Sequence, residues 1–213
     1  MAGRFSSMEA LVLRVRASGE SNREASFLTR EAGIVRALVY GGPKSKLRAF
    51  VSPFNSGLLY LYHDPVRDSY KVSDFDARAW RPKLRENYDR MMSAAAIAET
   101  ILAGHGGGSN WHEALQLADN SLNALENADA AVCARIWVRF LWLWADILGA
   151  APEDNSILNI NSGAIHWLEI AAKVEPSTLN RYVLDEGLLK QAENCCADIL
   201  SAAIGRRLRS WSW

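Results

Sequence analysis

The chain has 213 residues, 49% of them hydrophobic, and its 24 Lys and Arg balance its 24 Asp and Glu. Such a chain can bury a core, which excludes a disordered protein, and it is long enough for one large domain or two small ones. Three cysteines do not make a disulfide framework. The most apolar stretch contains Arg135, Arg139 and Asp146, which argues against a membrane span. We therefore expect a cytoplasmic protein.

The zero net charge conceals an asymmetry along the chain. Residues 1–85 hold 15 Lys and Arg against 8 Asp and Glu, a net charge of +7. The remaining residues hold 9 against 16, a net charge of −7. The pattern indicates a basic N-terminal unit followed by an acidic C-terminal one.

Residues 1–80 are typical of a small β-barrel. In the first expected strand Leu11, Leu13 and Val15 share one face, and Arg14 and Arg16 share the other. Short strand-like segments separated by turn residues follow, with no helical segment between them. The expected strands are residues 10–17, 24–30, 33–40, 47–54, 57–63 and 69–75. This pattern predicts a closed or partly open antiparallel barrel.

Residues 81–213 are expected to form a helical bundle. Gly104 is a stop signal for the first helix, and Ser109 or Asn110 can cap the second. The third is apolar almost all round and should lie at the centre of the bundle. The expected helices are residues 84–104, 111–127, 129–149 and 185–204, with residues 151–167 irregular.

The sequence contains little that indicates a catalytic site. No Lys-Ser/Thr pair follows the glycines at 106–108, as a phosphate-binding loop requires. His105 and His112 lack a nearby cysteine, and the adjacent Cys195 and Cys196 cannot easily both point at one metal ion. Because no catalytic triad or carboxylate pair stands out, we expect a protein that is not an enzyme and has no cofactor.

Nucleic-acid binding is the stronger hypothesis, because a glycine-rich loop with Lys44, Lys46 and Arg48 joins Arg14 and Arg16 in the basic unit. Such cations bind phosphates, and exposed aromatic side chains beside them can stack on bases. The candidate DNA-binding residues are Arg14, Arg16, Arg23, Arg30, Arg36, Lys44, Lys46, Arg48, Arg206, Arg207 and Arg209. The candidate stacking residues are Tyr40, Tyr60 and Tyr62. We expect Arg14, Arg16 and the loop to form one cationic track, extended by the three C-terminal arginines if the tail folds back.

The order of motifs resembles the RecO family of bacterial DNA repair and recombination mediators. In residues 18–54 a Gly-Glu-Ser turn precedes Leu28-Thr29-Arg30-Glu31-Ala32-Gly33, then the basic glycine loop, then Val51-Ser52-Pro53-Phe54. Residues 85–102 occupy the place of the family's first bundle helix. Residues 134–153 match a later helix with a Leu-Gly-x-x-Pro-Glu ending, and Ile204 to Trp211 resemble the family's closing motif.

This resemblance implies an OB-fold barrel followed by a helical bundle. It also implies binding of single- and double-stranded DNA, annealing of complementary strands, and association with the nucleoid. The implied partners are RecR, the C-terminal tail of single-stranded DNA-binding protein and, indirectly, RecA. Many members carry a four-cysteine zinc site where this chain, at about residues 150–182, has no cysteine, so the resemblance implies a zinc-less insertion there.

Alternatives remain for several features. The basic barrel could dock an acidic partner protein without any DNA role. A nuclease would need a carboxylate cluster, for which Asp74 and Asp76 are a thin basis. Trp137, Trp142 and Trp144 either all belong to the core, which is the favoured interpretation, or partly line a groove for a partner's tail.

Overall fold

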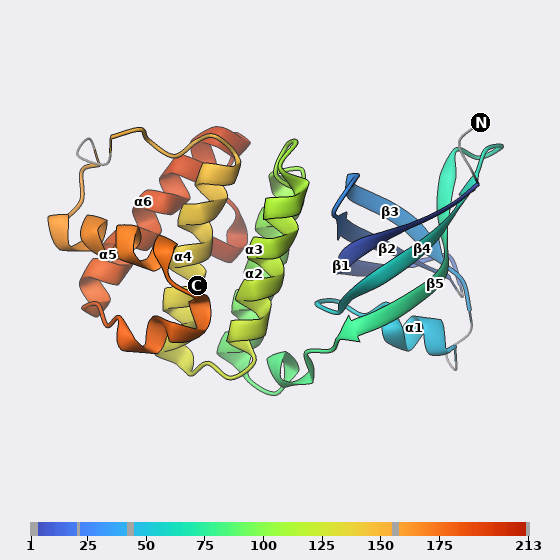
Figure 1. Ribbon diagram of the computed structural model, residues 1–213, viewed down its shortest axis with the longest axis horizontal. Coiled ribbons are helices and arrows are strands. Elements are labelled where there is room, and N and C mark those ends of the chain that lie inside the picture. Colours follow the sequence, from blue (N-terminus) through green and yellow to red (C-terminus); the bar gives the residue numbers. More distant parts are fainter. Residues whose placement is uncertain (1–3, 21, 42–44, 155–157, 212–213) are drawn as a thin grey trace. The chain divides into compact units, whose positions relative to one another are not determined.

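A computed structural model describes residues 4–20, 22–41, 45–154 and 158–211 of the chain (Figure 1). Its internal contacts divide it into two compact units, with the division between Arg81 and Pro82. The first unit is built of strands and the second of helices. Among the described residues, no helix combines the length and the apolar character needed to cross a bilayer.

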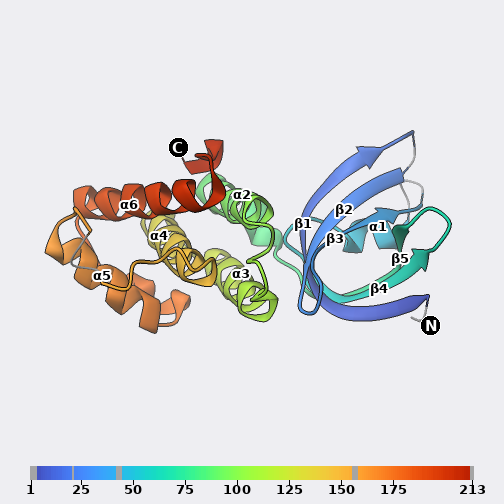
Figure 2. The same cartoon turned by 90° about the horizontal axis from the view of Figure 1, so that it is seen from above.

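The first unit is a closed five-stranded barrel, with the strands in the order β1-β2-β3-β5-β4 and β1 closing onto β4 (Figure 2). All neighbouring strands are antiparallel except β3 and β5, which are parallel. The strands are β1 Phe5–Ser18, β2 Asn22–Thr29, β3 Gly33–Val39, β4 Ser56–Asp64 and β5 Ser69–Ala79. This closed barrel, with a helix between β3 and β4, is the OB-fold that the family resemblance implies, and its parallel β3–β5 pair departs from the antiparallel barrel that the sequence pattern predicts.

Alternation of inward and outward side chains accounts for most of the barrel. In β3, Val35, Ala37 and Val39 enter the hydrophobic core, while the residues between them face outward. The centre of the core includes Phe27 and Phe75, whose ring centroids are 6.1 Å apart. This alternation determines which side chains remain on the outer surface for binding.

The prediction that Leu11 and Leu13 of β1 face the barrel core is wrong. Ala10 and Val12 enter the barrel core, and Val15 packs against it, whereas Leu11 and Leu13 are buried outside this cluster. The physical reason is a β-bulge between Val12 and Arg14, which shifts the alternation by one residue. Beyond the bulge, Arg14 and Arg16 share the outer face as predicted.

The strand predicted at residues 47–54 is also wrong, because the chain forms the short helix α1, Lys46–Phe50, there. Leu47 and Phe50 pack against the barrel core, next to the buried Val51. These apolar side chains are spaced by three and four residues, which suits a helix and not the alternation of a strand. A five-residue helix has little stability of its own, so its packing against the barrel holds it in place.

Gly57 lies where β4 comes close to β5. A Cβ atom there would lie 2.0 Å from the backbone oxygen of Asp76, so only glycine fits. We predict that Gly57→Ala forces the two strands apart and destabilises the barrel by about 1–3 kcal/mol, the usual cost of overpacking. Urea unfolding followed by circular dichroism measures this, with the exposed Ser7→Ala in β1 as the control. An unchanged unfolding midpoint for Gly57→Ala would contradict the close approach.

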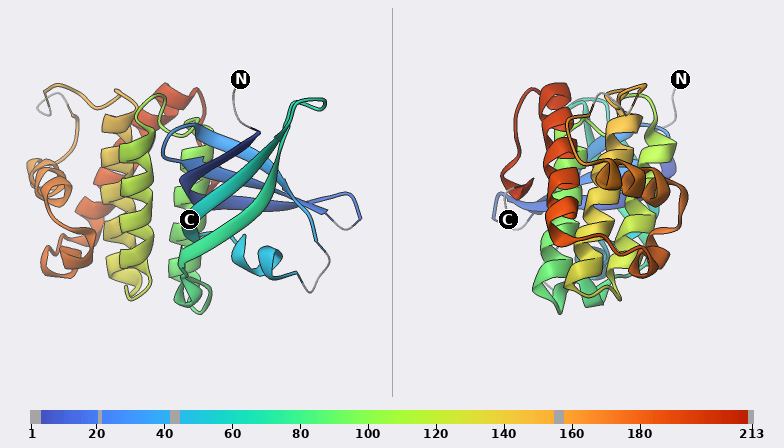
Figure 3. Two further views of the ribbon diagram at one scale, coloured as in Figure 1. Left: turned by 45° about the vertical axis from the view of Figure 1, so that its right-hand side comes forward. Right: turned by 90° about the vertical axis from the view of Figure 1, so that its left-hand side faces the viewer.

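The second unit is a helical bundle around α4 (Figure 3). Its main helices are α2 Tyr88–Ala103, α3 Trp111–Leu125, α4 Ala130–Ile147, α5 Ser162–Lys173 and α6 Glu186–Ile204. The short 3-10 helices are η1 Pro82–Arg85, η3 Pro176–Arg181 and η4 Arg209–Trp211. The helix α4 contacts each of the other four main helices, which confirms its predicted central position.

The ends of the bundle helices follow ordinary capping chemistry. The side chain of Asp129 accepts a hydrogen bond from the backbone N–H of Val132 at the start of α4, and Gly104 ends α2 as predicted. Asn110 is the residue before α3, but its side-chain amide donates to the carbonyl of Ile147 instead of capping. Its role is therefore to join α3 to the end of α4.

Two arginines in α4 are nearly buried and join this helix to its neighbours. The Nε of Arg139 donates to the carbonyl of Ala171 at 2.7 Å, and Arg135 donates to the carbonyl of Leu179 at 3.4 Å. Burial lowers the pKa of Arg139 from its ordinary value. These charged residues are thus compatible with a helix in the centre of the bundle.

The segment expected to be irregular, residues 151–167, contains the start of α5. Ala164, Trp167, Leu168 and Ala171 are buried at spacings of three and four residues, a helical pattern that the sequence interpretation missed.

Among the residues that the structure describes, no group of three or more His, Cys, Asp or Glu side chains is arranged to hold a metal ion.

Candidate nucleic-acid interface

Three arginines form a cluster on the outer face of β1, β2 and β3. Arg14 lies opposite Ser26, and Ser26 lies opposite Arg36, so all three residues are on one face. Because β2 lies between β1 and β3, the backbones of Arg14 and Arg36 are separated by two interstrand distances, about 10 Å. Arg16 follows Arg14 on the same face. We call Arg14, Arg16 and Arg36 the arginine cluster.

The arginines of this cluster repel one another. Partial burial, followed by repulsion from Arg16 and Arg36, lowers the pKa of Arg14 from its ordinary value. Glu24 lies opposite Arg16 and offsets one of the three positive charges. The Nε of Arg14 is shielded from solvent and has no hydrogen-bond partner among the described residues. An anion placed here relieves the repulsion, which makes the cluster suited to phosphate.

Other predicted DNA-binding residues lie elsewhere on the barrel. Arg30 is paired with Glu9 at 2.8 Å, which neutralises its charge. Arg23 lies half-buried at the start of β2, opposite the core residue Val39. Lys46 is exposed on α1, and Arg48 donates from the same helix to the carbonyl of Gly41 at 3.3 Å.

That the cations of α1 and the arginine cluster form one track remains a prediction. The helix α1 packs against the barrel core through Leu47 and Phe50, whereas the arginine cluster lies on the outer face of β1–β3. Lys44 lies outside the described residues. Whether the residues of α1 contact DNA remains a prediction.

The C-terminal tail folds back onto the helical unit. The ring N–H of Trp211 donates to the hydroxyl of Thr100 at 2.9 Å, and the Trp211 side chain is buried. Arg207 is paired with Asp198 at 3.1 Å, while Arg206 and Arg209 are exposed. The tail is thus an integral part of the bundle, and a DNA contact by its arginines remains a prediction.

The three predicted stacking tyrosines all lie on the outer surface of the barrel. Tyr60 and Tyr62 alternate with the core residues of β4, and Tyr40 follows the core residue Val39 at the end of β3. Tyr62 lies opposite Phe5 on one side, with ring centroids 5.2 Å apart, and opposite Lys71 on the other. We call Phe5, Tyr40, Tyr60, Tyr62 and Lys71 the aromatic patch.

Lys71 is the centre of this patch. Its Nζ lies 5.9 Å from the centroid of the Tyr40 ring and 5.8 Å from that of Tyr62, within the range of cation–π attraction. Its hydrogen bond to Asp64, 2.8 Å long, raises the pKa of Lys71 above its ordinary value and lowers the pKa of Asp64. The lysine is therefore charged and lies within cation–π range of both rings.

The arginine cluster and the aromatic patch are connected by strand register. Cross-strand pairs link neighbouring residues in a row that passes over all five strands. The row runs Arg16, Glu24, Leu38, Lys71, Tyr62, Phe5. Its members face outward, so one strip of surface joins cations to aromatic rings.

Sequence reasoning missed Phe5 and Lys71. The strand was expected to begin at residue 10, whereas β1 begins at Phe5 and leaves that ring 71% exposed. The signal available was that Phe5 shares a strand face with the polar Ser7 and Glu9, and that Lys71 alternates with the apolar Val72, which places both on outer faces. That they lie side by side depends on pairing across the barrel.

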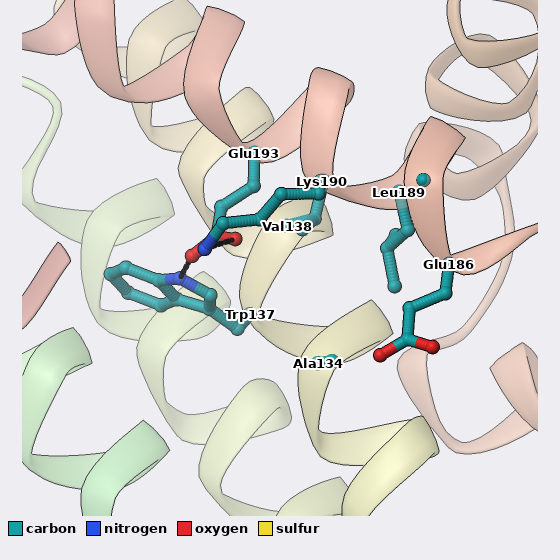
Figure 4. A pocket seen from close by; sticks show the side chains of 8 residues that line it. Ala134, Trp137, Val138, Glu186, Leu189, Lys190 and Glu193 are labelled. Carbon is teal, nitrogen blue, oxygen red and sulfur yellow. Dashed lines mark hydrogen bonds and ion pairs between the residues drawn. The ribbon is translucent and has the colours of Figure 1, made fainter. Parts of the chain in front are cut away.

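A groove of about 480 Å³ lies between α4 and α6, with Trp137 in its wall (Figure 4). The ring N–H of Trp137 donates to Glu193 at 3.2 Å, and Glu193 also accepts from Lys190. Trp137, Trp142 and Trp144 are all buried, as the favoured interpretation expects. Of these three, only Trp137 also lines the described groove.

The geometry defines a class of protein: an OB-fold barrel with a cationic outer face, followed by a helical bundle. Residues 1–78 match the family model described as "Recombination protein O N terminal". The chain is 30% identical over 215 residues to a protein of Pelotomaculum thermopropionicum named "DNA repair protein RecO", covering 95% of this chain and 82% of that relative. It is 32% identical over 126 residues to the protein of that name from Desulfitobacterium hafniense, covering 58% of this chain and 45% of the relative. The chain belongs to the RecO family.

Proposed function

We propose that this protein acts in DNA repair as a recombination mediator that binds single- and double-stranded DNA and anneals complementary strands. The observation that carries the proposal is the arginine cluster on the OB-fold barrel of a RecO family member. Three arginines against one glutamate leave a net charge of about +2 on this face, which favours phosphates over other ligands. No base-specific contact is needed for such binding.

Annealing follows from the same electrostatics. Two complementary strands repel each other through their phosphates, and a cationic surface that neutralises both backbones lowers this repulsion. Base pairing then supplies the specificity, so the step requires no nucleotide hydrolysis and the protein need not be an enzyme. The family likeness supports RecR as a partner, contact with the tail of single-stranded DNA-binding protein, and assistance in loading RecA in the bacterial cytoplasm.

A salt titration of oligonucleotide binding tests the DNA-binding part of the proposal. Contacts from the arginine cluster to three phosphates of a single strand, at ~0.7 per contact, predict a slope of about −2 in a plot of log affinity against log salt concentration. Further phosphate contacts make the slope more negative. Binding measured by fluorescence anisotropy gives this slope directly. A slope near zero, or no binding at low salt, favours instead a barrel that docks an acidic partner protein.

The annealing part is tested separately with two complementary oligonucleotides that carry a fluorophore and a quencher. The protein should accelerate their pairing without ATP, both alone and with RecR added. DNA binding with no acceleration of pairing would leave a DNA-binding protein that does not anneal strands.

A further inference from the structure

We propose that the aromatic patch is a platform for unpaired bases, which makes the barrel prefer single-stranded over double-stranded DNA. This inference rests on the proposed DNA binding and adds a second, separate contact to it. The arginine cluster binds the sugar–phosphate backbone, and the aromatic patch binds the bases.

The exposure of the rings is the first support. Phe5 is 71% exposed, Tyr40 39% and Tyr60 37%, although the barrel core is completed by other side chains. Single exposed apolar residues are common on protein surfaces, but a gathered group of them usually marks a binding surface. Bases stack on aromatic faces with little regard to sequence, so such a surface suits single-stranded nucleic acid.

The position of the patch beside the cations is the second support. Arg36, Leu38 and Tyr40 are spaced by two residues and share the outer face of β3 and its end. The strand therefore connects the arginine cluster to the aromatic patch. Four residues of strand span about 13 Å, which is the length of about four stacked bases at ~3.4 Å each. One short single strand can therefore contact both surfaces, while the row through Leu38 and Lys71 joins them sideways.

The charges within the patch favour bases over phosphates there. Lys71 is paired with Asp64, and Asp74 lies opposite Tyr60 on the neighbouring strand. The patch therefore offers ring faces and little net positive charge. In a duplex the bases are already stacked and paired, so only an unpaired strand can present them to these rings.

The test compares two single-stranded oligonucleotides of equal length and charge, one of thymidines and one of abasic sites. Wild-type protein should bind the thymidine strand at least about fivefold more tightly, since stacking contributes at least about fivefold per base. The patch variant Phe5→Ala/Tyr40→Ala/Tyr60→Ala/Tyr62→Ala should lose this preference while its affinity for the abasic strand and for a duplex stays unchanged. The ring-conserving variant Phe5→Tyr/Tyr40→Phe/Tyr60→Phe/Tyr62→Phe should retain the preference.

Two controls separate the possible failures. Tyr88→Ala removes an exposed ring from α2 and should change nothing, and circular dichroism shows whether the patch variant keeps its barrel. If wild-type protein binds both oligonucleotides equally, or the patch variant keeps the preference, the aromatic patch has no role with bases and the inference is wrong even though DNA binding stands. If neither oligonucleotide binds, the proposed function itself is wrong.

Discussion

Replacing Arg14, Arg16 and Arg36 together with Gln should reduce the affinity for single-stranded DNA by about 50-fold at 0.15 M salt. The estimate follows from counterion release, because three lost phosphate contacts at ~0.7 each lower the log–log salt slope by about 2. Their contribution vanishes near 1 M salt and grows as salt is diluted. Anisotropy titrations at several salt concentrations measure both the affinity and the slope.

A matched control removes three arginines that are already paired. Arg30 is bonded to Glu9, Arg78 lies 3.6 Å from Asp76, and Arg207 is bonded to Asp198. Replacing these three with Gln changes the net charge equally but should lower the affinity far less. Equal losses in the two variants would mean that the arginine cluster has no special role, and that overall charge or DNA contacts by Arg30 and Arg207 govern binding.

The loss caused by the arginine variant should be the same for every base sequence. Phosphates are shared by all sequences, so a variant that lacks only phosphate contacts weakens all complexes alike. A loss confined to one sequence would indicate that one of these arginines reads a base edge.

The sequence alone predicts the barrel well where side chains alternate. Val35, Ala37 and Val39 in β3 face the core, and Arg36 between them faces outward, as the alternation indicates. It fails at β1, because a bulge is a local insertion that exchanges the faces of Leu11 and Val12 without leaving a clear signal in the sequence. It also fails at α1, where covering the barrel core selects a helix over the strand that the apolar residues suggested.

The candidate site is only partly visible in the sequence for a related reason. Arg14 and Arg16 are neighbours along one strand, so their shared face follows from local alternation. Arg36 joins them only through the pairing of β1 with β2 and of β2 with β3, and Phe5 meets Tyr62 only because β1 closes onto β4. Such register depends on the whole barrel, which no single stretch of sequence specifies.

Trp144→Ala should be the most destabilising single change in the helical unit, lowering the free energy of unfolding by about 3–5 kcal/mol. The Trp144 ring is fully buried in α4 and stacks on Phe140, with ring centroids 5.7 Å apart. The turn after α2 packs so closely on it that a Cβ at Gly104 would lie 3.0 Å from its ring nitrogen. Removing the indole leaves a cavity that these neighbours cannot fill. Urea unfolding followed by far-ultraviolet circular dichroism measures the loss, and the exposed Tyr88→Ala should cost little.

Replacing Trp144 and Trp137 singly with Phe distinguishes the contribution of packing to stability from that of hydrogen bonding. The ring nitrogen of Trp144 is buried with no hydrogen-bond partner among the described residues, so Trp144→Phe also removes an unsatisfied polar group and recovers part of the cost of the smaller ring. The ring nitrogen of Trp137 donates to Glu193, so Trp137→Phe additionally loses a hydrogen bond to a charged group, at about 1.5–3 kcal/mol. We therefore expect Trp137→Phe to be the more destabilising of the two. The reverse order would mean that a polar partner, such as an ordered water, satisfies Trp144, and that the centre of the bundle is less dry than its packing indicates.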